Sequence, residues 1–596
     1  MSSVSTHRLR DLYRQSGQSE DLFPIFDRTK SFEPWIVVLA LIPALYVFQH
    51  ASLSESDAEW VLRSRDLLHA QTLEGVIGPG GVDSASELRF QPPLGTWLTA
   101  SVESVLPEFG VYVGMFFSWI ATGLLILVCY RLTRRLLGGR IALWTALLAS
   151  GQGLILWQAQ TVLPVSLSLL AALGAISFLQ DHLLRERGAV TWQILGGGLC
   201  LGICLLAGGP IVVLPVVIQL VTCFGEIRAD RRKSVSIIPP VKRVLALLLM
   251  WGIGLISSGW WPAVMASAYG REFWLFWWKG ISDGSPERTL FESLFLYLKV
   301  VGPIIGLAVF GARVSWRHAV REQDRASRQL ILWLAGGGVL SIVASFVLGT
   351  DSLLAVAALA FVSVVLAICS AIAFDQISRG DLGVVPAALL TFVPLVLVSV
   401  YDLNRDAPVS QQIWTVRILS VFCLLSLIFL HVIRNPSSFG GRYLLPGTCL
   451  ILIVVINYRV GLSSPPDVNT LTAFTEELES DQIVQLHQMF ERLPADLKRI
   501  EIVSPRNRTS RFRLELALAF PEAKIFQARN WNQVYARLSE LESHEMTAVI
   551  EWGIPQPRPH LPPDEHWRHR YLGQPENIGE TDELRLSVLF STDERD

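Results

Sequence analysis

Two stretches of the sequence carry side chains suited to acid–base and anion chemistry. Asp57 and Glu59 form an acidic pair, and Arg89 stands shortly before Pro92 and Pro93. A positioned carboxylate can take a proton from a hydroxyl group, whereas an arginine can bind a phosphate. The prolines restrict the backbone after the arginine and predict a turn there. What these side chains can do depends on the elements that position them.

The acidic pair lies at the start of a predicted helix. Ser56 and Glu59 match the capping-box pattern, and apolar residues recur at helical spacing from Trp60 onward. The sequence therefore predicts a short helix, residues 57–69, lying along the membrane surface. Asp57 falls in its first turn, where a carboxylate faces the positive end of the helix dipole. The plainer interpretation of both acids is that they stabilise this helix end.

The rest of the chain predicts a membrane protein. Hydrophobic residues make up 51% of the sequence and charged residues 17%. Apolar runs of about 17 to 22 residues recur, each long enough to cross a hydrocarbon core of roughly 30 Å as a helix. We expect an α-helical polytopic protein with about thirteen transmembrane helices, over residues 35–49, 110–130, 141–158, 161–180, 192–207, 210–224, 244–266, 293–312, 329–348, 353–374, 383–401, 413–432 and 443–461.

Charge asymmetry predicts the orientation. Alternate loops are rich in arginine, and the loops between them near residues 159, 208 and 350 contain no lysine or arginine. By the positive-inside rule the N-terminus is cytoplasmic and, with an odd number of spans, the C-terminal tail is extracytoplasmic, in a plasma (inner) membrane protein. The domains are then a cytoplasmic segment 1–33, a membrane domain 34–462 with outer loops 50–109 and 267–292, and an extracytoplasmic domain 465–596.

Two further features bear on the outer loops and the tail. Trp274, Trp277 and Trp278 share a helical face, which an aromatic belt at the headgroups explains better than a platform for stacking sugars. The tail alternates predicted strands with helical patterns and indicates a small α/β domain, the strands covering 499–504, 523–526 and 547–551.

Cysteine placement argues against two classes of site. The seven cysteines lie in or beside apolar runs and form no CxxC or Cys/His cluster, so they predict neither disulfides nor zinc. We predict no metal site, no cofactor and no nucleic-acid partner.

Three sequence motifs, taken in order and with their spacing, match those of a known family. The acidic helix over 57–68, the stretch Phe90-Gln-Pro-Pro-Leu-Gly-Thr-Trp-Leu98 and the Gly-Leu-rich run 198–210 ending in Gly-Gly-Pro occur in sequence over roughly residues 35–300. In this the chain resembles the GT-C glycosyltransferases that use polyprenyl-phosphate-linked sugars, particularly the aminoarabinose transferase and protein mannosyltransferase group. That group has an acidic first outer loop ending in Pro-Pro-Leu-x-x-Trp-Leu.

The chain departs from this family at its polar positions. Gln160 and Val165 stand where the family has Arg and Asp, Gly208 replaces the Lys before Gly-Pro, and Phe90-Gln91 replaces Glu-Lys. Near residue 350 the expected basic residue is also missing. The lost cations are those that would hold the lipid phosphate.

The resemblance implies an inverting transfer of a hexosyl or pentosyl group from a polyprenyl-phosphate donor to an envelope glycan, lipid or protein acceptor at the outer face. Asp57 is the implied catalytic base, and the candidate substrate-binding residues are Glu59, Arg89, Pro92, Pro93 and Arg288. Two alternatives remain. The missing cations fit a non-catalytic scaffold or accessory protein of envelope-glycan assembly, and the helix count alone fits a transporter or flippase.

Overall fold

The structure is a computed structural model. It describes residues 55–68, 92–105, 112–150, 152, 155, 165–184, 191–233, 240–279, 290–322, 324–348 and 352–379, and in the tail 499–503, 516, 523–528, 531, 533–534, 547–552, 576–580 and 584–589.

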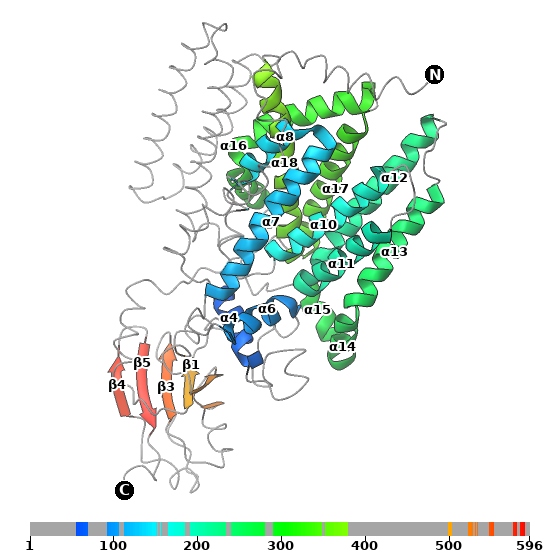
Figure 1. Cartoon of the computed structure of the whole chain (residues 1–596). Helices are drawn as coiled ribbons and strands as arrows, with labels where there is room; N and C mark the ends of the chain where they lie inside the picture. The colour runs from blue at the N-terminus through cyan, green and yellow to red at the C-terminus, as the bar shows by residue number, and fades with distance from the viewer. Residues whose placement is uncertain are drawn as a thin grey trace, which may run out of the picture.

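Long helices run side by side in a bundle (Figure 1). They are α7 (Tyr112–Leu137), α8 (Gly139–Ser150), α10 (Val165–Leu184), α11 (Thr191–Gly208), α12 (Val213–Lys233), α13 (Pro240–Ser258), α16 (Leu290–Arg317), α17 (Arg325–Leu348) and α18 (Leu353–Arg379). Single turns, η5 (Gly209–Val212) and η6 (His318–Glu322), join α11 to α12 and α16 to α17. The apolar runs of the sequence thus form helices, because only a helix pairs its own backbone groups in lipid.

Six helical stretches among the described residues are long and apolar enough to cross a membrane, judged by length and composition. The protein is therefore a polytopic helical membrane protein, as predicted. The spans predicted over 35–49, 383–401, 413–432 and 443–461 lie outside the described residues, so their total number stays a prediction, as do the predicted domain boundaries.

The centre of the bundle is α18, which packs against α8, α16 and α17. Its face is rich in buried alanine, and small residues let membrane helices approach closely. At Gly311 of α16 the approach is so close that an added Cβ would lie 1.8 Å from the carbonyl oxygen of Cys369. On the other side of α18, the rings of Trp144 and Phe374 stack with centroids 5.5 Å apart.

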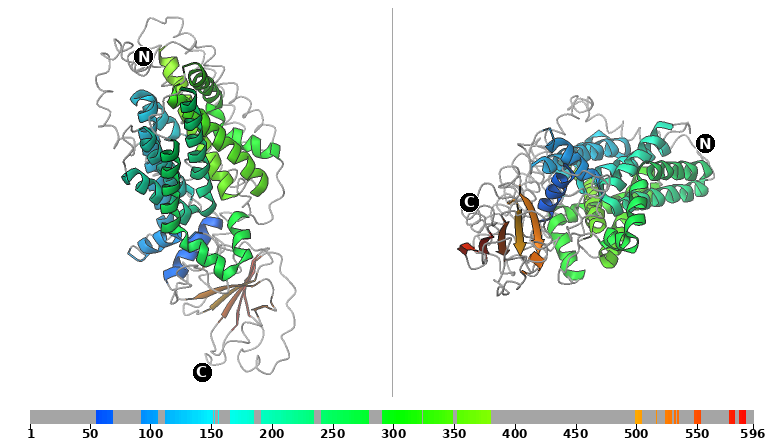
Figure 2. Two further views of the ribbon diagram at one scale, coloured as in Figure 1. Left: turned by 90° about the vertical axis from the view of Figure 1, so that its right-hand side faces the viewer. Right: turned by 90° about the horizontal axis from the view of Figure 1, so that it is seen from below.

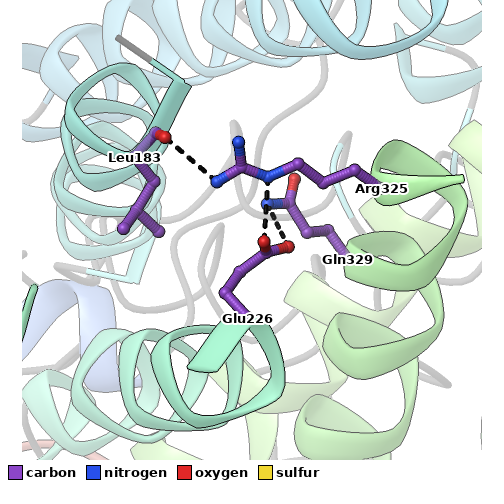
Figure 3. A network of polar contacts seen from close by, with 4 residues as sticks. All are labelled: Leu183, Glu226, Arg325 and Gln329. Atoms are coloured by element: carbon purple, nitrogen blue, oxygen red, sulfur yellow. Dashed lines mark hydrogen bonds and ion pairs between the residues drawn. The ribbon is translucent and has the colours of Figure 1, made fainter. Parts of the chain in front are cut away.

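Ion pairs join neighbouring helices at the basic end of the bundle. In Figure 3, Arg325 Nε of α17 lies 3.0 Å from Glu226 Oε2 of α12, and Gln329 Nε2 donates to Glu226 Oε1 at 3.1 Å. Arg325 Nη2 also donates to the carbonyl oxygen of Leu183 on α10 at 3.0 Å. Glu226 is buried, so this network compensates a carboxylate that would otherwise be costly in the bundle.

The helix predicted over 244–266 is divided. α13 ends at Ser258, and α14 (Trp260–Tyr269) and α15 (Arg271–Lys279) follow. Gly270 separates α14 from α15 with φ +57°, a conformation that glycine adopts without a Cβ clash. The apolar run therefore predicts the helical content, and the sharp change of backbone conformation comes at Gly270, beyond the predicted end of the run.

Helices α4 (Glu55–Leu68) and α6 (Leu94–Glu103) lie with α14 and α15 at one end of the bundle, and a β-sheet lies beyond that end (Figures 1 and 2). The last turns of α7, α12 and α18 and the first turn of α13 lie at the opposite end. The β-sheet of the tail thus lies at the same end as α4 and α6, and the arginine-rich helix ends lie at the other end. Which end faces the cytoplasm stays a prediction.

The tail contains a five-stranded mixed sheet in the order β2-β1-β3-β5-β4. Its strands are β1 (Arg499–Val503), β2 (Lys524–Ala528), β3 (Thr547–Trp552), β4 (Glu576–Glu580) and β5 (Leu584–Leu589). β1 pairs in parallel with β2 and β3, whereas β5 is antiparallel to β3 and β4. The predicted strands match β1 to β3, and the α/β character of the tail is confirmed.

Candidate functional site

The helix predicted over residues 57–69 is present as α4 and packs on α6. α4 begins at Glu55, so Ser56 lies inside the first turn rather than before it, and Asp57 keeps its predicted first-turn place. The next turns are buried against α6, where Ser64 Oγ lies 3.3 Å from Glu103 Oε2. The side chains of Asp57 and Glu59 lie outside the described part, so their roles stay predictions.

The proline pair forms the entry to α6. Pro92 and Pro93 are both buried, and Pro93 precedes the first helical residue with φ −86° and ψ −16°. Its carbonyl oxygen accepts a hydrogen bond from the Trp97 amide at 2.9 Å, the first of the helix. Proline suits a helix start because the amide hydrogen that it lacks would have no helical partner there. The turn therefore places the pair in the interior rather than on an exposed loop.

The turn after α11, η5, packs against Pro92 of the proline pair. Gly209 has φ +51°, and a Cβ added there would lie 2.9 Å from Pro92 Cγ and 2.4 Å from Trp277 Nε1. Only glycine combines this backbone conformation with such close neighbours. The structure thus brings together the proline stretch, the Gly-Gly-Pro turn and α15, which lie far apart in the sequence. Order and spacing drew attention to the first two of these segments.

Trp277 belongs to an aromatic cluster on α14 and α15. Its ring stacks on Phe273 with centroids 5.6 Å apart, and Phe273 meets Trp261 edge-on at 5.7 Å. Trp274 and Trp278 are 43% and 38% exposed, which fits the predicted aromatic belt. Trp277 departs from that expectation, because its indole nitrogen is buried beside Gly209. Helical spacing shows that the three tryptophans share a face, but only the fold shows which one turns inward.

Several polar atoms in this region are buried without a hydrogen-bond partner within the described structure. They are Trp60 Nε1 on α4, Thr96 Oγ1 on α6 and Trp277 Nε1 on α15. A buried polar group without a partner costs about 1–3 kcal/mol, so such groups are uncommon without a reason. Each of these atoms can donate to a phosphate or hydroxyl oxygen.

The cations of the region are distributed unevenly. Arg63 is buried, and its Cζ lies 5.5 Å from the Trp60 ring centroid, within the range of a cation–π contact. Arg271 is exposed at the start of α15. Arg89 and Arg288 lie outside the described residues, so their predicted substrate contacts stay predictions. Across the described part of the chain, no group of three or more His, Cys, Asp or Glu residues could hold a metal ion.

Comparison with known proteins identifies the fold. No protein-family model matches the chain, and no curated protein sequence matches it. Among solved structures it is similar to ArnT from Cupriavidus metallidurans bound to undecaprenyl phosphate, with 13% identity and a TM-score of 0.60 over 94% of this chain and 98% of that one. ArnT in the apo state gives 15% identity and a TM-score of 0.57 with the same coverage.

An oligosaccharyltransferase from Archaeoglobus fulgidus in the apo form gives 11% identity and a TM-score of 0.49, over 88% of this chain and 70% of that one. The GT-C fold implied by the order of the sequence motifs is thereby confirmed. The likeness to ArnT extends over nearly the whole of both chains.

Proposed function

We propose that this protein is a membrane glycosyltransferase that moves a sugar from a polyprenyl-phosphate donor to an acceptor at the outer face of the inner membrane. The fold supports the class of reaction, since ArnT of the same fold binds undecaprenyl phosphate. In this proposal the end of the bundle that carries α4, α6 and α15 faces outward, and the acceptor is a glycan, lipid or protein of the envelope.

The observation that carries the proposal is the meeting of Pro92, Gly209 and Trp277. Trp277 Nε1 is a buried donor that has no acceptor among the described residues, and it lies at the turn where the resembled family has its Lys-Gly-Pro. A lipid phosphate has the oxygen atoms that such a donor needs, and a hydrogen bond to a charged acceptor contributes about 1.5–3 kcal/mol. We infer that the indole N–H takes over part of the role of the lysine that Gly208 replaces.

The proposed reaction is a displacement at the anomeric carbon. The acceptor oxygen forms a bond to that carbon from one face, and the bond to the donor phosphate oxygen breaks on the other. Asp57 takes the acceptor proton, and the polyprenyl phosphate leaves with the bonding electron pair. Donors beside the phosphate stabilise its growing negative charge. The configuration at the anomeric carbon inverts.

The first test compares two carboxylates of one helix turn. Asp57→Asn and Glu55→Gln each remove a charge from the first turn of α4, and each costs about 0.3–1 kcal/mol of helix stability. Removal of a catalytic base lowers the rate by about 10²–10⁴-fold. In proteoliposomes with a polyprenyl-phosphate sugar, Asp57→Asn should lose transfer while Glu55→Gln keeps it. Equal activity of the two variants refutes the role of Asp57, and transfer from a soluble nucleotide sugar refutes the donor class.

A second candidate function is a non-catalytic scaffold with the same fold. It is favoured by the absence from the sequence of the family's cations at Gln160, Gly208 and around residue 350. A scaffold would bind polyprenyl phosphate or its partners without turnover. If wild-type protein binds the lipid-linked sugar, and no acceptor fraction from the envelope receives the sugar, this second candidate replaces the first.

A further inference from the structure

An open apolar groove runs between α12 and α13 at the basic end of the bundle. Its volume is about 800 Å³, and Arg228 is the one charged residue in its lining. The apolar lining comes from both helices, from Phe224, Ile227, Pro240, Val241, Val244, Leu245 and Leu248. Figure 1 shows α12 and α13 at the edge of the bundle, and the last turn of α12 and the first turn of α13 lie at the end opposite to α4, α6 and α15. The groove is therefore separate from the proposed transfer site.

Most of the apolar lining is exposed, although Ile227 is buried. Phe224 is 61% exposed, Val241 76% and Leu245 54%. In a chain that spans a membrane, an apolar surface on the outside of the bundle faces lipid rather than water. On α13 the spacing of Val241, Val244, Leu245 and Leu248 forms one stripe along the helix. The stripe extends about 10 Å along the axis at 1.5 Å per residue, which is less than half of a hydrocarbon core of roughly 30 Å.

One basic residue lies in the lining of the groove, and another is adjacent to a lining residue in the sequence. Arg228 and Lys242 are both exposed, and within the described part of the chain neither has an ion-pair partner. The helix end from Arg228 to Lys233 has the sequence Arg-Ala-Asp-Arg-Arg-Lys, with four cations and one acid. Basic residues beside a membrane span attract anionic headgroups. An apolar groove shorter than one leaflet, with an exposed arginine in its lining, matches the acyl chain and the charged headgroup of an anionic lipid.

We propose that this groove binds an anionic phospholipid, with one acyl chain along the α13 stripe and the headgroup phosphate against Arg228. The lipid comes from the leaflet at the basic end of the bundle, which the positive-inside rule assigns to the cytoplasm. Binding links α12 to α13, and the basic cluster lies on the last turns of α12. The site does not depend on whether the protein transfers sugar.

Native mass spectrometry of the full-length protein in detergent tests this site. The probes are phosphatidylglycerol and phosphatidylcholine with identical acyl chains, and inorganic phosphate serves as a competitor. We expect tighter binding of phosphatidylglycerol, and Arg228→Gln should weaken it about fivefold, the factor expected for one basic residue at an anionic membrane surface. Leu245→Trp should fill the groove and reduce the binding of both lipids.

Matched controls lie outside the groove on comparable surfaces. Arg317→Gln removes another exposed arginine at the end of α16, and Leu255→Trp enlarges an exposed residue further along α13. Neither should change lipid binding. Equal affinity of wild-type protein for the two lipids, equal losses in Arg228→Gln and Arg317→Gln, or unchanged binding in Leu245→Trp would each overturn the proposal. Displacement of the lipid by millimolar phosphate would identify a free-anion site instead.

Discussion

Replacing Gly209 by alanine should destabilise the protein, and the structure gives the size of the effect. The residue has φ +51°, and a left-handed conformation costs an L-residue about 1–2 kcal/mol. The new Cβ would also lie 2.4 Å from Trp277 Nε1, and overpacking of this kind costs about 1–3 kcal/mol. The indole cannot move aside easily, because it stacks on Phe273. Together the two terms predict a loss of about 2–5 kcal/mol.

A double variant separates the two terms. Trp277→Ala removes the clash with the indole but neither the close contact with Pro92 nor the backbone strain. The free-energy loss of Gly209→Ala/Trp277→Ala should therefore be smaller than the sum of the two single losses by about 1–3 kcal/mol. Gly252→Ala on α13 is the matched control, because nothing lies within 4 Å of an added Cβ there. That change should stabilise the helix by about 0.5–1 kcal/mol.

The assay is reversible unfolding in detergent–denaturant mixtures, with the apparent melting temperature as a second measurement. The same variants also test the site, because displacement of Trp277 removes the donor proposed to bind the phosphate. Two results would refute the reasoning. One is a Gly209→Ala protein as stable as the wild type, and the other is a double variant whose loss equals the full sum.

Three further predictions follow from features described above. Cysteines introduced at Arg321 and Gln533, both exposed, should be labelled from opposite sides of the membrane. Labelling of both from the same side would place the C-terminal tail on the cytoplasmic side and contradict the predicted orientation. Arg325→Gln should lower the free energy of unfolding by less than the about 3–5 kcal/mol lost when a fully buried pair is broken, because the Arg325 side chain is 32% exposed. Adding Glu226→Gln to this variant should recover part of the loss, as measured by denaturation. A fragment of residues 465–596 should fold as an α/β domain, and a random-coil circular dichroism spectrum would contradict this.

The sequence predicts the helices of the bundle well, because a run of apolar residues in lipid has one way to pair its backbone. It predicts β1 to β3 on other grounds, since each is a short stretch that contains β-branched or aromatic residues. β4 was missed because Glu576–Glu580 has one apolar side chain among charged and polar ones. β5 does alternate, with Leu584, Leu586 and Val588 on one face, and that signal could have been used.

The candidate site was predictable only in part. Order and spacing drew attention to Pro92, Pro93 and the Gly-Gly-Pro turn, since a local motif is visible in the chain. Nothing local indicates that Trp277 rather than Trp274 turns toward Gly209. That choice is set by the turn at Gly270, which fixes the angle of α15, and by the packing of Phe273 on Trp261. Contacts between distant segments are decided by the whole bundle.

The central place of α18 has a consequence for biogenesis. α8 leaves the ribosome early, yet it packs against α18, and Arg140 pairs with Asp375 at 3.0 Å. Synthesis of the intervening chain, on the order of 200 residues, takes about 10–40 s at 5–20 residues per second. During that time the surface of α8 that later packs against α18 is not covered by α18, and Arg140 must contact the insertion machinery or lipid instead of Asp375. In chains stalled before residue 353, α8 should cross-link to the insertion machinery or to lipid, and these cross-links should disappear once α18 has been inserted.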